Sequence, residues 1–295
     1  MDEHSCDCPA KVNLSLAILG YDPDARMHAV DTVMAKISLA DTISLRITQG
    51  HGISVEFSFE LASGAQASVN PEENSLTRAY YELGKLAGGE LPGMLLRVTK
   101  RIPAGSGLGG GSSDAAAFLR MIREMAAQAA RPESGLSRIS QLTDRDWLEL
   151  AARVGADVPA FMVQGPVRAR GFGEKVEVVA LESLNDYRCI LGVPKASFST
   201  ASMYAKVRSY SSRNHTQGFL DEWHTGGPEA ALRVARNDFT PIARNTSSEL
   251  RDLLDSLTSF GYPLASVTGS GSCVFAVAKA EDAGKANLPV YRFID

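Results

Sequence analysis

Five glycines stand among the seven residues from 105 to 111, within the stretch KRIPAGSGLGGGSSDAAAFL. A strand-like apolar run, GMLLRVTKRI, precedes this glycine loop, and an alanine-rich sequence with helical spacing follows it. Glycine allows positive φ angles and lets a ligand approach the main chain closely. The first amides of a helix have no partner within the helix and carry the positive end of its dipole. The glycine loop is therefore predicted to be a cradle for a phosphate chain.

Two common phosphate loops do not fit this stretch. Gly105, Gly107 and Gly110 satisfy the dinucleotide pattern G-x-G-x-x-G, but Pro103 interrupts the entry from the strand. The acidic residue expected about 20 positions further on would still lie in the helix. Walker A also fails, because no Lys-Ser or Lys-Thr follows the glycines. A dinucleotide oxidoreductase is accordingly the weakest alternative.

Composition narrows the class of protein. The chain has 295 residues, a net charge of -4 and 22% charged residues, without a basic run that would follow a nucleic acid. No apolar stretch reaches the roughly 18 residues of a membrane span, and the acidic N-terminus lacks the apolar core of a signal peptide. The four cysteines have no zinc-site spacing. We expect a cytoplasmic protein that binds neither nucleic acid nor membrane.

Strand and helix patterns alternate along the chain. Runs with a period of two cover 11–19, 41–48 and 53–61, and Gly50 and Gly52 predict a hairpin between the last two. Helical patterns cover 74–88, 112–130 and 143–155, and Ser112 or Ser113 is expected to cap the second of these. The segment 263–278 reads as strand, glycine turn and strand. The mixture predicts an α+β fold, with two lobes.

Four motifs resemble one family, in the order that the family has them. PAGSGLGGGSSDAAA resembles the phosphate loop of the GHMP kinases, and CPAKVNLSLAILG, GADVPAF and SVTGSGSCVFAV resemble its N-terminal, middle and C-terminal motifs. The resemblance implies a two-lobed α+β fold. An N-terminal ATP-binding lobe, residues 1–166, would contain a left-handed β-α-β crossover. A C-terminal lobe of antiparallel sheet and helices, residues 167–295, would contribute to acceptor binding.

Several phrases are most similar to one branch of that superfamily. PEENSL, VPKASFSTASMY and RNDFTPIA resemble the kinases that phosphorylate the 2-hydroxyl of 4-diphosphocytidyl-2-C-methyl-D-erythritol in non-mevalonate isoprenoid (terpenoid) biosynthesis. The resemblance implies ATP and magnesium, a cytidine diphosphate-linked polyol as acceptor, and a monomer or homodimer. The alternatives are a GHMP kinase for another small alcohol, such as homoserine or mevalonate, and an inactive nucleotide-binding homologue.

The resemblance also implies which residues form the site. Lys11 and Asp157 would be catalytic, although a solvated strand lysine and a turn aspartate would look the same in isolation. His28 and Tyr204 would hold the cytosine, whereas Met27 stands where the family usually has a second aromatic. The remaining acceptor residues would be Asn13 and Thr200. The ATP-binding residues would be Asn74, near the adenine, and Pro103, Ala104, Gly105, Ser106, Gly107, Leu108, Gly109, Gly110, Gly111, Ser112 and Ser113. The metal ligands stay open among Ser112, Ser113 and Asp114.

Overall fold

The computed structural model describes residues 3–61, 70, 74–128, 139–211 and 214–295. The chain forms two compact units. Unit 1 consists of residues 1–9, 40–104 and 109–163, and unit 2 of residues 10–39, 105–108 and 164–295. The boundary predicted at residue 166 separates the two lobes implied by the family resemblance, not these two compact units, and it stays a prediction. The α+β class is confirmed, because strands in parallel and antiparallel pairs combine with helices.

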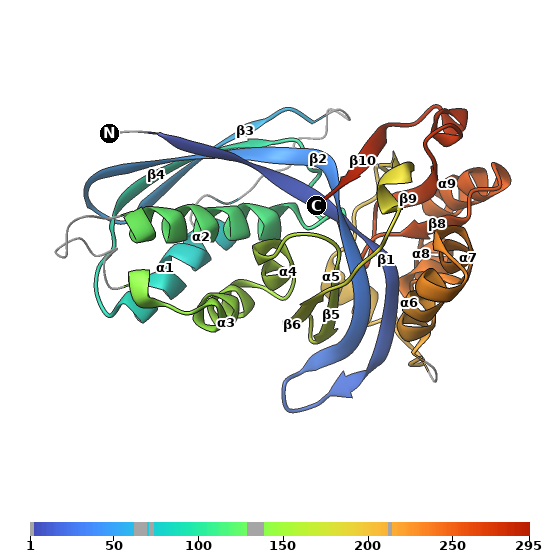
Figure 1. Cartoon of the computed structure of the whole chain (residues 1–295), viewed down its shortest axis with the longest axis horizontal. Coiled ribbons are helices and arrows are strands. Elements are labelled where there is room, and N and C mark those ends of the chain that lie inside the picture. The colour runs from blue at the N-terminus through green and yellow to red at the C-terminus, as the bar shows by residue number, and fades with distance from the viewer. Residues whose placement is uncertain (1–2, 62–69, 71–73, 129–138, 212–213) are drawn as a thin grey trace. The chain divides into compact units, whose positions relative to one another are not determined.

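Unit 1 is a sheet with helices on one side (Figure 1). Two long strands pass through both units, and the C-terminal half of the second lies in unit 1. That half pairs antiparallel with β4, and β4 pairs parallel with β3. The elements are β1 (His4–Asp22), β2 (Met27–His51), β3 (Ile53–Phe59), α1 (Ser75–Ala87), β4 (Pro92–Lys100), α2 (Gly110–Gln128), a short 3-10 turn (Ile139–Gln141), α3 (Asp144–Val154) and α4 (Val158–Met162).

The predicted hairpin between β2 and β3 is wrong. Gly50 and Gly52 do turn the chain, with φ angles of +80° and +101°. However, β3 lies on the far side of β4, and α1 connects this parallel pair. Only Gly52 separates the two strands, which is too short for a two-residue hairpin turn. A period of two fixes which side chains share a face, but it does not say which strand is the neighbour.

The helix ends predicted for α1 and α3 are confirmed. Asn74 Oδ1 accepts hydrogen bonds from the amides of Leu76 and Thr77, and Gly88 ends α1 with a φ of +64°. Thr143 and Asp146 form a reciprocal capping box at the start of α3. The last two residues of the predicted helix 112–130, and residues 71–73 of PEENSL, lie outside the described residues.

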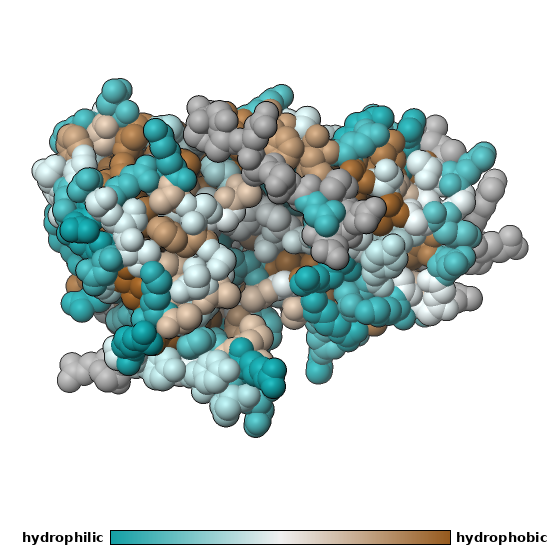
Figure 2. Space-filling view, turned by 180° about the vertical axis from the view of Figure 1, so that it is seen from behind, coloured by the Kyte–Doolittle hydropathy of each residue, from teal (hydrophilic) through white to brown (hydrophobic). Residues whose placement is uncertain are grey.

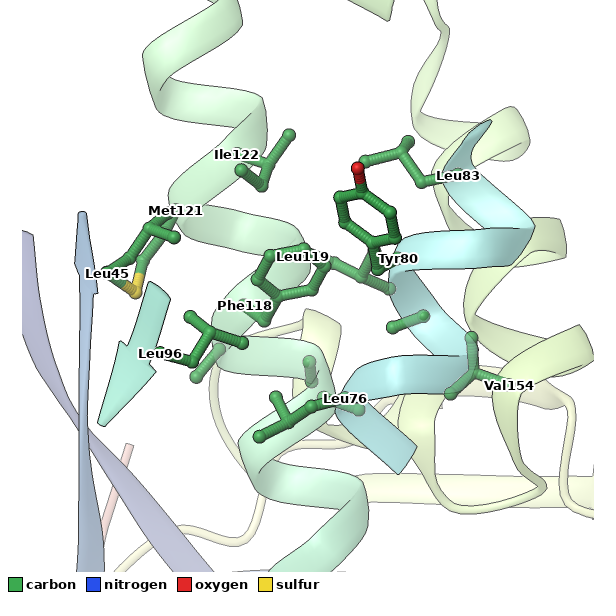
Figure 3. Close-up of a cluster of buried hydrophobic side chains, with 14 of the residues drawn as sticks. Leu45, Leu76, Tyr80, Leu83, Leu96, Phe118, Leu119, Met121, Ile122 and Val154 are labelled. Carbon is green, nitrogen blue, oxygen red and sulfur yellow. The ribbon is translucent and has the colours of Figure 1, made fainter. Parts of the chain in front are cut away.

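The core of unit 1 joins the sheet to its helices (Figure 3). Leu45 and Leu96 come from β2 and β4, and Phe118 from α2 packs among them with less than 1% of its surface exposed. Tyr80 of α1 is buried as well, and its hydroxyl donates to the carbonyl of Leu91 at 3.1 Å. This packing fixes α2, whose N-terminal end continues the glycine loop.

Unit 2 has antiparallel strands and a layer of helices (Figure 1). The strand order is β10-β7-β9-β8, and β5 pairs with both β6 and the N-terminal part of β2. The elements are β5 (Val167–Gly171), β6 (Lys175–Val178), β7 (Tyr187–Gly192), α5 (Thr200–Tyr204), α6 (His215–Thr225), α7 (Pro228–Val234), α8 (Phe239–Thr246), α9 (Ser248–Ser259), β8 (Leu264–Val267), β9 (Val274–Lys279) and β10 (Val290–Ile294), with 3-10 turns at Leu184–Asp186 and Ala283–Ala286.

Candidate functional site

The second half of the glycine loop forms the start of α2, in unit 1. The helix begins at Gly110, and the amide of Ser113 already donates to the carbonyl of Gly109 at 2.9 Å. Ser112 and Ser113 therefore lie inside the first turn, and the prediction that one of them caps the helix is wrong. The amides before Ser113 in this turn have no acceptor one turn back in the helix. These are the donors that a phosphate would require.

The first half of the loop, Gly105–Leu108, lies in unit 2 against the C-terminal glycine turn. Gly107 has a φ of +79°, and a Cβ there would come within 2.1 Å of the carbonyl oxygen of Thr268. The Thr268 hydroxyl donates to the Gly107 carbonyl at 3.1 Å, and the amide of Cys273 donates to Ser106 at 3.0 Å. Only glycine fits at Gly107, because a side chain would clash with main-chain atoms.

The N-terminal motif joins the same network through β1. The amide of Lys11 donates to the carbonyl of Leu108 at 2.9 Å, and its Nζ donates to Asn13 Oδ1 at 2.6 Å. Asn13 Oδ1 also accepts from the Gly269 amide at 2.8 Å and, at 3.2 Å, from the Thr268 hydroxyl, whose single proton is shared with the Gly107 carbonyl. Three of the four motifs therefore meet around the side chain of Asn13, within unit 2.

Asn237, to which the motifs assigned no role, binds the main chain of the C-terminal glycine turn. Its Nδ2 donates to the carbonyls of Val267 at 2.8 Å and of Gly269 at 2.9 Å, and it is 4% exposed. It thus holds the C-terminal glycine turn from outside. In the sequence, the motif RNDFTPIA indicated which branch of the family the chain resembles. It did not indicate that the side chain of Asn237 would bind the main chain 30 residues further on.

Asp157 occupies the N-cap position of α4 in unit 1 and is half-buried. Among the described residues, its side chain makes no capping hydrogen bond to that helix. Capping the helix is therefore not the role of the Asp157 carboxylate. The same motif packs against α2, since a Cβ on Gly155 would lie 4.0 Å from Ser112 Oγ. In unit 1 the middle motif and the second half of the glycine loop are therefore neighbours.

Aromatic rings gather around His28 in unit 2. The ring of Tyr204 stacks on His28 with centroids 4.6 Å apart and an angle of 21° between the planes. Tyr21 and Tyr210 lie 5.0 Å and 6.1 Å from the same imidazole, and each is nearly half exposed. Burial lowers the pKa of His28. The sequence assigned no role to Tyr21 or Tyr210, because neither lies in the part of a motif that the resemblance covers.

The other predicted site residues lie as follows. Met27 is 43% exposed beside His28 in the chain, and Thr200 begins α5, where its hydroxyl accepts from Ser270 Oγ at 3.2 Å. Pro103 and Ala104 connect β4 to the loop and belong to unit 1. Asn74 caps α1 through its Oδ1, and its Nδ2 donates to the carbonyl of Asn70 at 3.1 Å.

The described residues contain no group of three His, Cys, Asp or Glu side chains suited to a metal ion. Two oxygens at the start of α2, Ser113 Oγ and Asp114 Oδ1, are buried without a hydrogen-bond partner among the described residues. Asp114 Oδ2 accepts from Lys100 Nζ at 2.6 Å. Burial raises the pKa of Asp114 to about 6, against the opposing effect of Lys100.

The cysteines do not contribute reactive groups to this network. Cys273 follows the C-terminal glycine turn and is fully buried, and burial raises its pKa to about 12. Its thiol is therefore protonated at neutral pH, and it packs as a small apolar side chain. All four cysteines are free thiols.

No helix in the described ranges is both long enough and apolar enough to cross a membrane. The face drawn in Figure 2 carries hydrophilic residues over much of its area, with hydrophobic residues in smaller groups among them.

Comparison with known proteins places the chain in a family. Residues 74–165 match the pattern of the GHMP kinases N terminal domain, and residues 226–288 match that of the GHMP kinases C terminal domain. A relative from Geobacter sp. (strain M21), named 4-diphosphocytidyl-2-C-methyl-D-erythritol kinase, is 31% identical over 277 residues. That alignment covers 94% of this chain and 90% of the relative.

Solved structures agree with the sequence matches. A crystal structure of 4-(cytidine 5'-diphospho)-2C-methyl-D-erythritol kinase, 25% identical, covers 99% of this chain and 100% of its own, with a TM-score of 0.72. Homoserine kinase from Cytophaga hutchinsonii has a TM-score of 0.71 at 17% identity, covering 100% of this chain and 95% of its own. The second likeness shows the fold alone, so the fold does not separate these substrates. The chain belongs to the GHMP kinase family and is an ATP-dependent small-molecule kinase.

Proposed function

We propose that this kinase transfers the γ-phosphoryl group of ATP to the 2-hydroxyl of 4-diphosphocytidyl-2-C-methyl-D-erythritol. The relatives that share about a third of its residues over nearly its whole length are named for that substrate. The observation that carries the proposal is the network around Asn13, which joins Lys11 to the glycine loop and to the C-terminal glycine turn. Within unit 2 this network places a lysine beside the glycine-rich main chain of residues 105–108, and such a combination is suited to polyphosphate binding.

Phosphoryl transfer depends mainly on position and on neutralising charge. The loop from Pro103 to Ser113 would hold the triphosphate through main-chain amides, and Asn74 would lie near the adenine. Asp157 would accept the proton of the attacking hydroxyl while that oxygen bonds to the γ-phosphorus and ADP leaves. Lys11 would stabilise the negative charge that develops during transfer.

Four residues of unit 2 would hold the acceptor. His28 and Tyr204 offer a stacked pair of rings beside which a pyrimidine can lie, and stacking on aromatic side chains is a common means of holding a base. Thr200 would stand on the cytosine side and Asn13 on the polyol side. The oxygen of the Asn13 side chain already accepts three hydrogen bonds, and one proton of its Nδ2 is donated to Thr32. The second Nδ2 proton of Asn13 would therefore make the contact with the polyol.

Magnesium would accompany the triphosphate and neutralise charge on its oxygens when bound. The oxygens of Ser112, Ser113 or Asp114 would reach it directly or through water. The buried and unpaired Ser113 Oγ fits a group that awaits a ligand. Asp114 Oδ1 is buried and unpaired among the described residues as well, while Lys100 binds the other oxygen of that carboxylate. We further propose that the kinase works in the cytoplasm as a monomer or homodimer, without nucleic acid or membrane.

The test is a direct comparison of acceptors. The purified chain is incubated with MgATP and, in turn, the diphosphocytidyl alcohol, homoserine and mevalonate, and ADP release and the phosphorylated product are measured. We expect kcat/KM for the diphosphocytidyl alcohol to exceed that for the others by at least about a hundredfold. Turnover of homoserine or mevalonate instead would favour the alternative of a GHMP kinase for another small alcohol, which the methionine at position 27 supports. No turnover with any alcohol, together with ATP binding, would identify an inactive homologue.

A further inference from the structure

Three charged side chains are buried together in unit 1, at the root of the glycine loop. Asp41 of β2 is fully buried, Lys100 at the end of β4 is 5% exposed, and Asp114 in the first turn of α2 is 3% exposed. Lys100 Nζ donates to Asp41 Oδ2, and it donates to Asp114 Oδ2 at 2.6 Å. Burial alone would lower the pKa of Lys100, but the attraction of both carboxylates raises it, so the lysine is charged.

The cluster touches the chain on both sides of the loop. On the entry side, Asp41 Oδ1 accepts from the main-chain amides of Arg101 at 2.5 Å and of Ile102 at 2.8 Å. On the exit side, Lys100 binds Asp114, and a Cβ on Gly110 would lie 3.2 Å from Asp41 Oδ2. The seven residues from 103 to 109 run between these two fixed points.

We propose that Asp41, Lys100 and Asp114 form a loop anchor, a set of positioning residues that fixes both ends of the glycine loop for nucleotide binding. The inference rests on the proposed role of that loop in holding the triphosphate. Main-chain amides bind a polyphosphate well only if they are already aimed at it, because ordering a free loop opposes binding. By tying the entry strand to the exit helix, the anchor reduces that cost before ATP arrives.

Stability alone does not explain the loop anchor. Burying three charged groups costs desolvation, and well-packed apolar side chains often stabilise a protein as well or better. With all three groups ionised the cluster carries an excess negative charge, and Asp114 Oδ1 is left without a partner among the described residues. Unlike apolar side chains, the charged groups give directed contacts, because Asp41 accepts from two particular amides and Lys100 donates to two particular carboxylates.

The test is Lys100→Met, which removes the bridge and keeps the apolar stem. We expect the KM for MgATP to rise by about tenfold or more, while the KM for the acceptor alcohol stays within about threefold. Amide hydrogen exchange in the peptide containing residues 101–115 should become faster in the protein without nucleotide. A lysine with a merely structural role would lower the melting temperature and leave the KM for MgATP unchanged.

The matched control is Arg168→Met in unit 2. Arg168 forms an ion pair with the fully buried Asp31, at 2.9 Å and 2.6 Å, and contacts no residue of the glycine loop in the described contacts. Its loss should destabilise the fold to a similar degree without changing the KM for MgATP. The loop anchor is refuted if Lys100→Met keeps the wild-type KM for MgATP, or if Arg168→Met raises that KM equally.

A second variant covers the case in which Lys100→Met does not fold. Asp114→Asn retains an oxygen that can accept from Lys100 but removes the charge, and we expect a rise in the KM for MgATP of about threefold. An unchanged KM would overturn the proposal. Wild-type protein that neither binds nor consumes MgATP would overturn the proposed function itself, and wild-type turnover with unaffected variants would overturn the loop anchor alone.

Discussion

The Nζ atom of Lys11 donates a 2.6 Å hydrogen bond to Oδ1 of Asn13, two residues along the same strand. Side chains two apart on a strand share a face, and both of these are almost fully buried. The same Asn13 oxygen accepts from Gly269, so the position of the lysine is coupled to the C-terminal glycine turn. Lys11 is therefore not a solvated strand lysine.

Asn13→Leu should impair both stability and turnover. The leucine has a similar size but cannot accept from Lys11 or Gly269, and losing a buried acceptor costs about 1–3 kcal/mol of unfolding free energy. Because Lys11 would no longer be held in place, we expect kcat to fall by about ten- to a hundredfold. Denaturant unfolding and steady-state kinetics measure the two effects.

Asn214→Leu is the control for this change. Asn214 caps α6 and bonds to Asp31 in the same unit, so its loss should cost about 1 kcal/mol of unfolding free energy. It should leave kcat unchanged. Equal losses of kcat in the two variants would mean that Asn13 acts through stability alone.

Gly107→Ala and Gly218→Ala should change stability in opposite directions. At Gly107 the φ of +79° and the nearby Thr268 carbonyl exclude a methyl group, so the loop must shift and the fold should lose more than about 1 kcal/mol. Gly218 lies within α6 with open space around it, and alanine there should add about 0.5–1 kcal/mol. Thermal melts of both variants check the signs, and a tolerated alanine at 107 would refute the close approach of the loop to the turn.

The sequence predicted those features that are encoded locally. Asn74 and Gly88 mark the ends of α1 because a helix needs a side-chain acceptor at its start and a left-handed residue at its end. The glycine loop was recognised for a similar reason, since its positive φ angles depend on residues within the loop. Family motifs added the GHMP kinase fold, which the comparisons confirm.

The failed predictions concern partners that are distant in the sequence. Whether β3 pairs with β2 or with β4 depends on the crossover through α1, which strand periodicity does not encode. Ser112 and Ser113 resembled caps, but the helix already begins at Gly110. A Cβ at Gly110 would come within 3.0 Å of the Ile102 side chain, a tertiary contact that the local sequence does not reveal. The loop anchor was equally invisible, because its members come from three separate elements.

Asp157→Asn should abolish turnover and preserve nucleotide binding. The amide has the shape of the carboxylate but cannot accept the proton of the attacking hydroxyl, so we expect kcat to fall by about a hundredfold or more. Calorimetric titration with a non-hydrolysable ATP analogue should give an affinity close to that of the wild type. If kcat is preserved, Asp157 is not the base, and if the affinity for nucleotide falls in parallel, its role is in binding.

Asp114 predicts a pH dependence of stability with a definite sign. Its pKa is about 6 in the folded protein and 3.8 for the free side chain, so the folded state binds more protons between these values. The free energy of unfolding contributed by this group is therefore present below about pH 4 and lost as the pH rises through 6. The charged groups that face it are Lys100 and Asp41.

Comparing the wild type with Asp114→Asn isolates this contribution from all other acids. At pH 4 residue 114 is uncharged in both folded proteins, as a carboxylic acid in one and an amide in the other, so the variant should gain little stability over the wild type. At pH 7 the variant should be relatively more stable, by at most about 3 kcal/mol, since one pKa unit corresponds to about 1.4 kcal/mol. Urea titrations at both pH values measure the difference, and a difference that does not change with pH would show that Asp114 is already ionised at pH 4.

The ring pair of His28 and Tyr204 predicts how the acceptor is selected. Tyr204→Leu removes the ring stacked on His28 at 4.6 Å, and losing one aromatic face for a base costs about 1–3 kcal/mol of binding. The KM for the diphosphocytidyl alcohol should therefore rise by about ten- to a hundredfold, with little change in the KM for MgATP. Tyr81→Leu, an exposed tyrosine on α1 in unit 1, is the control and should change neither constant.

Met27→Tyr tests the same site in the opposite direction. Met27 is exposed next to His28 and offers a sulfur but no flat face, so a tyrosine there supplies a second surface for stacking. We expect a lower KM for the diphosphocytidyl alcohol, by about three- to tenfold, with homoserine and mevalonate unaffected. Because Tyr21 already lies 5.0 Å from His28, its ring can partly serve this purpose, and the gain should be larger in a Tyr21→Leu background. If Tyr204→Leu and Met27→Tyr both leave that KM unchanged, the base does not lie against these rings.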